Sequence, residues 1–240
     1  MKDLFVNEDG HSINFESLSK SQQFWSFCYD TAQLQVVDLL PLDEEARKAF
    51  FLNIFQILAF HASVLASCSS PLLPSSSPLP RLFYLIGGFR YNLPAILHGI
   101  LRGNRPPPNA PTKPVFGEET TDLRRTFTLK ELDPRVHFVV VTALLTLRRI
   151  DEKADLMSAS LNGFGPWASP VESVFNKENL NSCLNKATQS FLFSGGLKIY
   201  CEKSEIRVPQ ILERYESDFG GVDGLLKFIL GYQSEEIKKL

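Results

Sequence analysis

The chain has 240 residues, of which 44% are hydrophobic and 22% charged, and its formal net charge is −2. The length suits one large domain or two small ones, and nineteen phenylalanines suggest a core rich in aromatic rings. Because the charge is near neutral and has no long run of either sign, nucleic acid and anionic membrane surfaces are not expected as main partners.

The N-terminal residues are charged where a secretory signal needs an apolar core, so we expect a cytoplasmic protein. Ser19 to Leu40 carries apolar residues near helical spacing and is predicted to be a helix. Asp43 is placed to cap a second helix that runs to about Ala66, and two glutamates follow it at the positive end of the helix dipole.

This second helix is apolar nearly all round, and Ala49 to Pro80 contains no Lys, Arg, Asp or Glu. A membrane span needs roughly 20 apolar residues, so the segment has to be considered as one. However, Asn53, Gln56 and His61 lie inside the candidate span, and each would be costly in lipid. We therefore favour a buried central helix over a membrane span.

A Ser- and Pro-rich loop is predicted over 67–80, and Phe83 to Tyr91 then predicts a β-hairpin. The Gly-Gly pair in the middle of that segment supplies the positive φ angles that a two-residue turn requires. Asn92 can cap the helix that follows, whose apolar stripe ends at Gly103.

The second half of the chain begins with a Pro-rich loop over 104–121. Val136 to Thr142 is β-branched and apolar on both faces, which predicts a central strand. A third loop is expected over 151–171. The remaining predicted elements are a helix over Lys177–Phe193, strands over Leu197–Glu202 and Ile206–Val208, and helices over Gln210–Ser217 and Val222–Gly231.

Five segments in order carry a family resemblance. They are FFLNIFQILAFHA (50–62), YLIGGFRYNLPAILHGILRGNRPP (84–107), DPRVHFVVV (133–141), VFNKENL (174–180) and VPQILERYESDFG (208–220). Together they resemble the domain-of-unknown-function 547 (DUF547) family over nearly the whole chain. We therefore divide the chain into an N-terminal extension (1–18), a DUF547-like domain (19–232) and a C-terminal tail (233–240).

The resemblance implies a mostly helical α+β single domain with a small β-sheet, found alone or fused to other modules, some of them signalling modules. The family's arrangement of Asn, His and a Cys in an SCP-type motif resembles a papain-like or transglutaminase-like thiol site. That likeness is an analogy, because a fold does not settle a function.

This sequence departs from the family pattern at the thiol. The family's Cys-containing segment usually leads directly into the VF-x-x-ENL helix, whereas here 142–164 resembles an insertion. Counted back from that helix, Ser169 occupies the position of the family's Cys. The four cysteines, Cys28, Cys68, Cys183 and Cys201, lie elsewhere and have no CxxC pairing, so we expect reduced thiols and no structural zinc. A thiol mechanism is not expected.

Three candidate catalytic residues follow. His137 opens the predicted strand and has a side chain whose ordinary pKa of about 6.5 suits a general base, although a core histidine is an equal alternative. Ser169 can act as a nucleophile only with a base within about 3 Å. Asn53 lies between Gln56 and His61 on the apolar helix, where the three either orient a substrate or, as we favour, satisfy core hydrogen bonds.

Three candidate binding residues lie elsewhere. His98 and Arg102 are four residues apart, so they share a helix face that suits an anion or a partner's carboxylate, although a solvated polar face is favoured. Arg135 stands two residues before His137. The histidines lack HxxxH or HxH spacing, and neither a metal nor a cofactor is expected.

Two hypotheses remain. The favoured one is a non-catalytic interaction domain, a pseudoenzyme whose partner is an unidentified protein, peptide or small molecule. The alternative is a papain-like or transglutaminase-like hydrolase or transferase with Ser169 as nucleophile and His137 as base. Convergence of Asn53, His61, His137 and Ser169 on one site would favour the enzyme.

Overall fold

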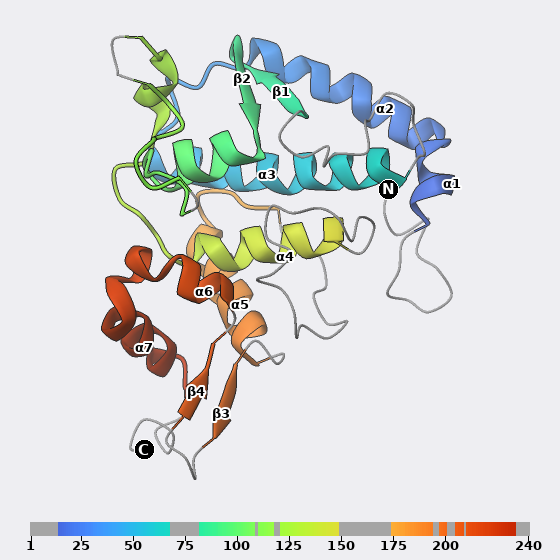
Figure 1. Ribbon diagram of the computed structural model, residues 1–240. Coiled ribbons are helices and arrows are strands. Elements are labelled where there is room, and N and C mark those ends of the chain that lie inside the picture. Colours follow the sequence, from blue (N-terminus) through green and yellow to red (C-terminus); the bar gives the residue numbers. More distant parts are fainter. Residues whose placement is uncertain are drawn as a thin grey trace.

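The computed structural model describes residues 14–67, 82–108, 110–117, 121–148, 174–193, 197–200, 205–208 and 210–233. Over these residues the chain is a mostly helical α+β single domain, as the sequence predicted (Figure 1). The predicted small sheet is a pair of separate two-stranded antiparallel sheets. Of the loop predicted over 67–80, Ser67 is helical, and 68–80 lie outside the described residues, as do the loop predicted over 151–171, Ser169, Cys68 and Cys201.

Helix α3 (Glu44–Ser67) is the central element, as predicted, and packs lengthwise against α4 (Figure 1). It begins where the Asp43 carboxylate accepts a 2.9 Å hydrogen bond from the backbone N–H of Ala46. Within the described part of the chain, Glu44–Leu65 is long and apolar enough to cross a bilayer, but 56% of its apolar window is buried inside the protein. It is therefore no clear membrane span.

The single helix predicted over Ser19–Leu40 is wrong in detail. The structure has two α-helices there, α1 (Phe15–Ser19) and α2 (Gln22–Thr31), followed by the 3₁₀ segment η2 (Ala32–Val36). The break occurs because the Ser21 hydroxyl accepts a hydrogen bond from the N–H of Phe24 and caps α2.

The predicted hairpin is confirmed as strands β1 (Phe83–Ile86) and β2 (Phe89–Asn92). Gly87 and Gly88 have φ angles of 55° and 82°, as a type I′ turn requires. The Gly87 N–H also donates to the carbonyl of Leu34, which ties the hairpin to η2.

The helix after the hairpin is capped by Asn92, as predicted, but it is the π-helix η3 (Ala95–Leu101). Its wide turns are visible in the bond from the Arg102 N–H to the Leu97 carbonyl, five residues back. Gly99 lets the aromatic ring of Phe116 approach closely, since a Cβ atom at this position would lie 2.3 Å from that ring. A short 3₁₀ segment, η4 (Leu123–Phe127), follows in the chain.

The strand predicted over Val136–Thr142 is wrong, because these residues form the first part of helix α4 (Val136–Arg148). Val136 to Val141 are all buried, so burial on every side leaves no periodicity to separate strand from helix. The signals that favour a helix are the length of the apolar run and Asp133-Pro134 at its start. Residues 142–148 of the predicted insertion continue this helix.

The C-terminal part approaches α4 from the side opposite α3 (Figure 1). Its predicted elements are all present, although most of their bounds differ from those predicted. They are α5 (Leu180–Phe191), β3 (Lys198–Tyr200), β4 (Glu205–Arg207), α6 (Gln210–Arg214), the 3₁₀ segment η8 (Glu216–Phe219) and α7 (Gly221–Gly231).

Replacing Gly99 by alanine tests the packing of η3. The new Cβ would overlap the buried ring of Phe116, so we expect Gly99→Ala to lower the free energy of unfolding by about 1–3 kcal/mol. Gly231→Ala is the matched control, because nothing lies within 4 Å of that Cβ position. Urea unfolding of both variants measures the difference, and equal stability of the two would contradict the packing described.

Candidate functional site

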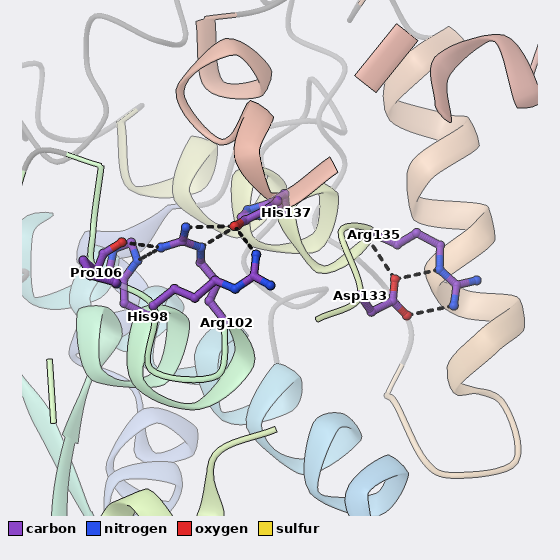
Figure 2. A network of polar contacts seen from close by, with 8 residues as sticks. His98, Arg102, Pro106, Asp133, Arg135 and His137 are labelled. Atoms are coloured by element: carbon purple, nitrogen blue, oxygen red, sulfur yellow. Dashed lines mark hydrogen bonds and ion pairs between the residues drawn. The ribbon is translucent and has the colours of Figure 1, made fainter. Parts of the chain in front are cut away.

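The carboxylate of Asp218, in η8, is the centre of a buried polar cluster. Its Oδ2 accepts hydrogen bonds from Arg102 Nε at 2.5 Å and His137 Nε2 at 2.8 Å. Its Oδ1 accepts from Arg102 Nη2 at 3.0 Å and Arg105 Nη1 at 3.2 Å. We call these residues, with His98 and Tyr215, the Asp218 cluster. Figure 2 shows Arg102 between His98 and His137.

Water has almost no access to the central ion pair. The side chains of Asp218 and Arg102 are 0% and 3% exposed. Burial by itself would raise the pKa of Asp218, but hydrogen bonds from His137 and Arg102 outweigh burial and hold that pKa well below its usual range. The two parallel bonds from one guanidinium give the pair a fixed geometry. Asp218 is therefore an ionised carboxylate whose acceptor capacity is fully used.

The partners of His98 and His137 fix their protonation. His98 Nδ1 lies 2.9 Å from Arg102 Nη1 and must accept, because a guanidinium only donates. His137 Nε2 must donate, because the ionised Asp218 only accepts. Burial lowers the pKa of His98 to about 3, and burial also lowers that of His137. Both imidazoles are therefore neutral at physiological pH.

Tyr215 covers the cluster with its aromatic ring. The ring stacks on His137 with centroids 4.4 Å apart, and the Arg102 guanidinium lies 4.8 Å from its centre. Burial raises the pKa of Tyr215 to about 12, so its hydroxyl stays protonated. His137 itself is 1% exposed, and its Nδ1 has no hydrogen-bond partner among the described residues.

Local structure explains how the cluster assembles. The π-helix η3 turns His98 and Arg102 inward, and the first turn of α4 supplies His137. Arg102 Nη1 also donates to the carbonyl of Pro106, which follows η3 in the chain (Figure 2). The cluster therefore joins three segments that are far apart in sequence. The solvated polar face favoured for His98 and Arg102 is wrong, because both are buried: Arg102 binds the carboxylate of Asp218, and His98 binds Arg102.

Arg135 forms a second polar contact rather than joining the Asp218 cluster (Figure 2). It makes two parallel bonds to Asp133, at 2.9 and 2.8 Å. It also donates to the side-chain oxygens of Asn181 and Asn185 on α5. Arg135 thus links the start of α4 to α5.

The polar residues of α3 have separate partners. Asn53 binds both backbone groups of Phe175, donating to the carbonyl at 2.7 Å and accepting from the N–H at 2.9 Å. This pairing satisfies core backbone groups, as we favoured from the sequence. Gln56 is half-buried and makes no side-chain hydrogen bond to another described residue.

His61 belongs to a different contact between α2, α3 and β1. Its Nδ1 lies 2.9 Å from the hydroxyl of Tyr84, and its Nε2 lies 3.7 Å from the sulfur of Cys28. Burial lowers the pKa of His61 to about 4 and raises that of the Cys28 thiol. The pair therefore consists of a neutral imidazole and a protonated thiol, not the ion pair of an activated cysteine.

The four residues expected to converge are thus not joined in the described structure. Among the residues described, no hydrogen bond connects Asn53, His61 and His137 with one another, and Ser169 lies outside them. The described residues also contain no group of three His, Cys, Asp or Glu side chains placed to hold a metal ion.

Asp218, Tyr215 and Arg105 were not predicted as site residues from the sequence. A signal was present in the segment VPQILERYESDFG, where Tyr215 and Asp218 stand three residues apart just before a Gly-Gly break. Spacing of this kind places both on one side of a helical turn. Nothing in the sequence indicates that their partner is an arginine 116 positions earlier.

The fold and the buried centre define a mostly helical α+β domain held by an Arg–Asp–His cluster. In a comparison with known proteins, residues 39–150 match the family described as Protein of unknown function, DUF547. This segment belongs to that family, and it includes Arg102 and His137. No curated protein and no solved structure matches the chain.

Removing the charge of Asp218 tests whether the cluster holds the fold. Asp218→Asn would leave the buried Arg102 without a counter-ion, so we expect a loss of about 3–5 kcal/mol in the free energy of unfolding. The exposed Asp223, also a carboxylate, gives the matched control Asp223→Asn, with an expected change below about 1 kcal/mol. Urea unfolding provides both values. A loss for Asp218→Asn as small as that of the control would show that the cluster is dispensable for the stability of the fold.

Acidification tests the neutral histidines. The pKa values of His61, His98 and His137 are lowered in the folded state, so the unfolded chain binds their protons first. Stability is then complete above about pH 6.5 and falls as the pH drops below that value, by at most roughly 1.4 kcal/mol per pH unit for each histidine.

Urea unfolding between pH 7 and 5 measures this slope. In the His61→Phe variant, the number of protons that the chain takes up on unfolding should fall by about one, because the other two histidines are unchanged. A stability that stays flat over this range would mean that the histidines are not buried in the neutral form.

Proposed function

We propose that this chain is a non-catalytic binding or scaffold module in which a thiol-type site has degenerated. The observation that carries the proposal is the state of His137, the residue expected to act as base. Its Nε2–H donates a hydrogen bond to Asp218, its ring is stacked on that of Tyr215, and 1% of its surface is exposed. A general base must reach the proton that it removes, and a side chain enclosed in this way favours a structural role.

The other candidate groups support the same proposal. Asn53 uses both ends of its amide on the backbone of Phe175 and has little capacity left to orient a substrate. The thiol of Cys28 and the imidazole of His61 are both uncharged, so this second thiol–histidine pair has no thiolate. We place the module in the cytoplasm, with a protein, peptide or small molecule as its partner.

One observation favours the alternative, a papain-like or transglutaminase-like hydrolase or transferase. Asp218 orients His137 through Nε2 and leaves Nδ1 without a partner among the described residues, as a carboxylate–histidine pair in a catalytic triad would. In this alternative Ser169 is the nucleophile and His137 Nδ1 takes its proton.

A serine-reactive fluorophosphonate separates the two functions. We expect intact-mass analysis of the wild-type chain to show no stoichiometric adduct, because a serine without an accessible base is not activated. Ser169→Ala and His137→Gln are treated in parallel, with Ser158→Ala as a control for a serine in the same part of the chain. Circular dichroism checks that each variant folds. A single adduct that disappears in Ser169→Ala and His137→Gln, but remains in Ser158→Ala, would establish the enzyme instead.

A further inference from the structure

Helix α2 and the segment after it carry large apolar side chains that are exposed. Trp25 is 64% exposed, Tyr29 76%, Val36 81% and Leu40 70%. Single exposed apolar residues are common on proteins, but a concentration of four within a short stretch of chain is a mark of an interaction site. We call these four residues the α2 surface.

The exposed position of the α2 surface follows from the packing of α2. Phe24 and Phe27 face the core, where their rings lie 5.4 and 5.5 Å from that of His61 on α3. Trp25 and Tyr29 are four residues apart and therefore share a different, outward face of the helix. A surface helix usually has a polar outer face, whereas the exposed face of α2 includes two aromatic side chains. Figure 1 shows α2 on the far side of α3 from α4.

The stretch of chain that carries the α2 surface is acidic. Residues 21–46 contain five carboxylates and no Lys, Arg or His, a formal charge of −5, whereas the whole chain has −2. Asp43 pairs with Lys177, and Glu44 accepts hydrogen bonds from two backbone N–H groups. The side chains of Asp30, Asp38 and Glu45 are exposed. Lys20, the cation just before this stretch, pairs with Glu16.

We propose that the α2 surface docks a basic amphipathic protein segment, in which apolar side chains are flanked by lysine or arginine. The inference rests on the proposed binding function and names the chemistry of its partner. Apolar anchors would cover Trp25 and Tyr29, and the flanking cations would meet the carboxylates of Asp30 and Asp38. The same carboxylates repel an acidic partner, which gives the surface selectivity.

The charge also argues against two other occupants. An anionic bilayer surface attracts basic segments, and this stretch has no basic residue. A second copy of the chain would bring one acidic stretch against another, which costs free energy unless cations intervene. A basic protein segment is the occupant that satisfies both the apolar face and its acidic surroundings.

A synthetic helical peptide of leucine and lysine is the probe, and Trp25 is the reporter. The full chain is used with Trp167→Phe, which leaves Trp25 as the single tryptophan. We expect saturable binding with a blue shift of Trp25 emission, weakened by added salt because the carboxylates are exposed. Tyr29→Lys and the double change Asp30→Lys/Asp38→Lys should each lower the affinity by about tenfold or more.

Val222→Lys is the matched control, because Val222 is 57% exposed on α7, outside the α2 surface, and should change the affinity by less than about twofold. A leucine and glutamate peptide of the same apolar pattern should not bind. The proposal is overturned if the basic peptide fails to bind, if the acidic peptide binds equally, or if Tyr29→Lys has no effect.

Two further outcomes would also overturn the proposal. They are a Trp25 blue shift with phosphatidylglycerol vesicles but not with the peptide, and a dimer in sedimentation that Tyr29→Lys dissociates. All of these outcomes leave the fluorophosphonate result unchanged, so failure of this inference is distinguishable from failure of the proposed function.

Discussion

The Arg102–Asp218 ion pair is the interaction on which the rest of this domain depends. It is buried, it uses both oxygens of the carboxylate, and it joins the end of the π-helix η3 to η8 near the C-terminus. Burying two charges is costly unless each is fully paired, so the surrounding groups have to complete the hydrogen bonds. His137 and His98 do so at opposite ends of the pair. The cluster thereby connects the C-terminal segments to the α3–α4 core.

The same requirement determines what the histidines can do. A carboxylate held ionised by Arg102 accepts a hydrogen bond from the Nε2–H of His137, and a guanidinium that only donates leaves His98 Nδ1 unprotonated. Both rings are then neutral, and Tyr215 encloses the ring of His137. A cluster of this kind resembles a catalytic centre in composition, but its groups are directed at one another. We therefore interpret it as the structural remainder of a site, and we look for binding on the surface of α2.

The sequence predicted elements whose signals are local. The cap at Asp43, the Gly87-Gly88 turn and the cap at Asn92 were each correct, because every one depends on residues within a few positions. Helix α4 was predicted as a strand because burial on all sides removes the periodicity that separates the two structures. His98, Arg102 and His137 were recognised as candidates, whereas Asp218 was not. An ion pair across 116 positions leaves no local pattern, and only the fold reveals it.

The protonation state of His137 tests this account most directly. Nitrogen-15 NMR of the imidazole ring reports which nitrogen carries the proton and whether the ring titrates. The account predicts a ring that is neutral at pH 7 with its proton on Nε2, and a pKa below the ordinary value while the protein remains folded. A proton on Nδ1, or a titration near the ordinary pKa of about 6.5, would contradict it and return His137 to the role of a general base.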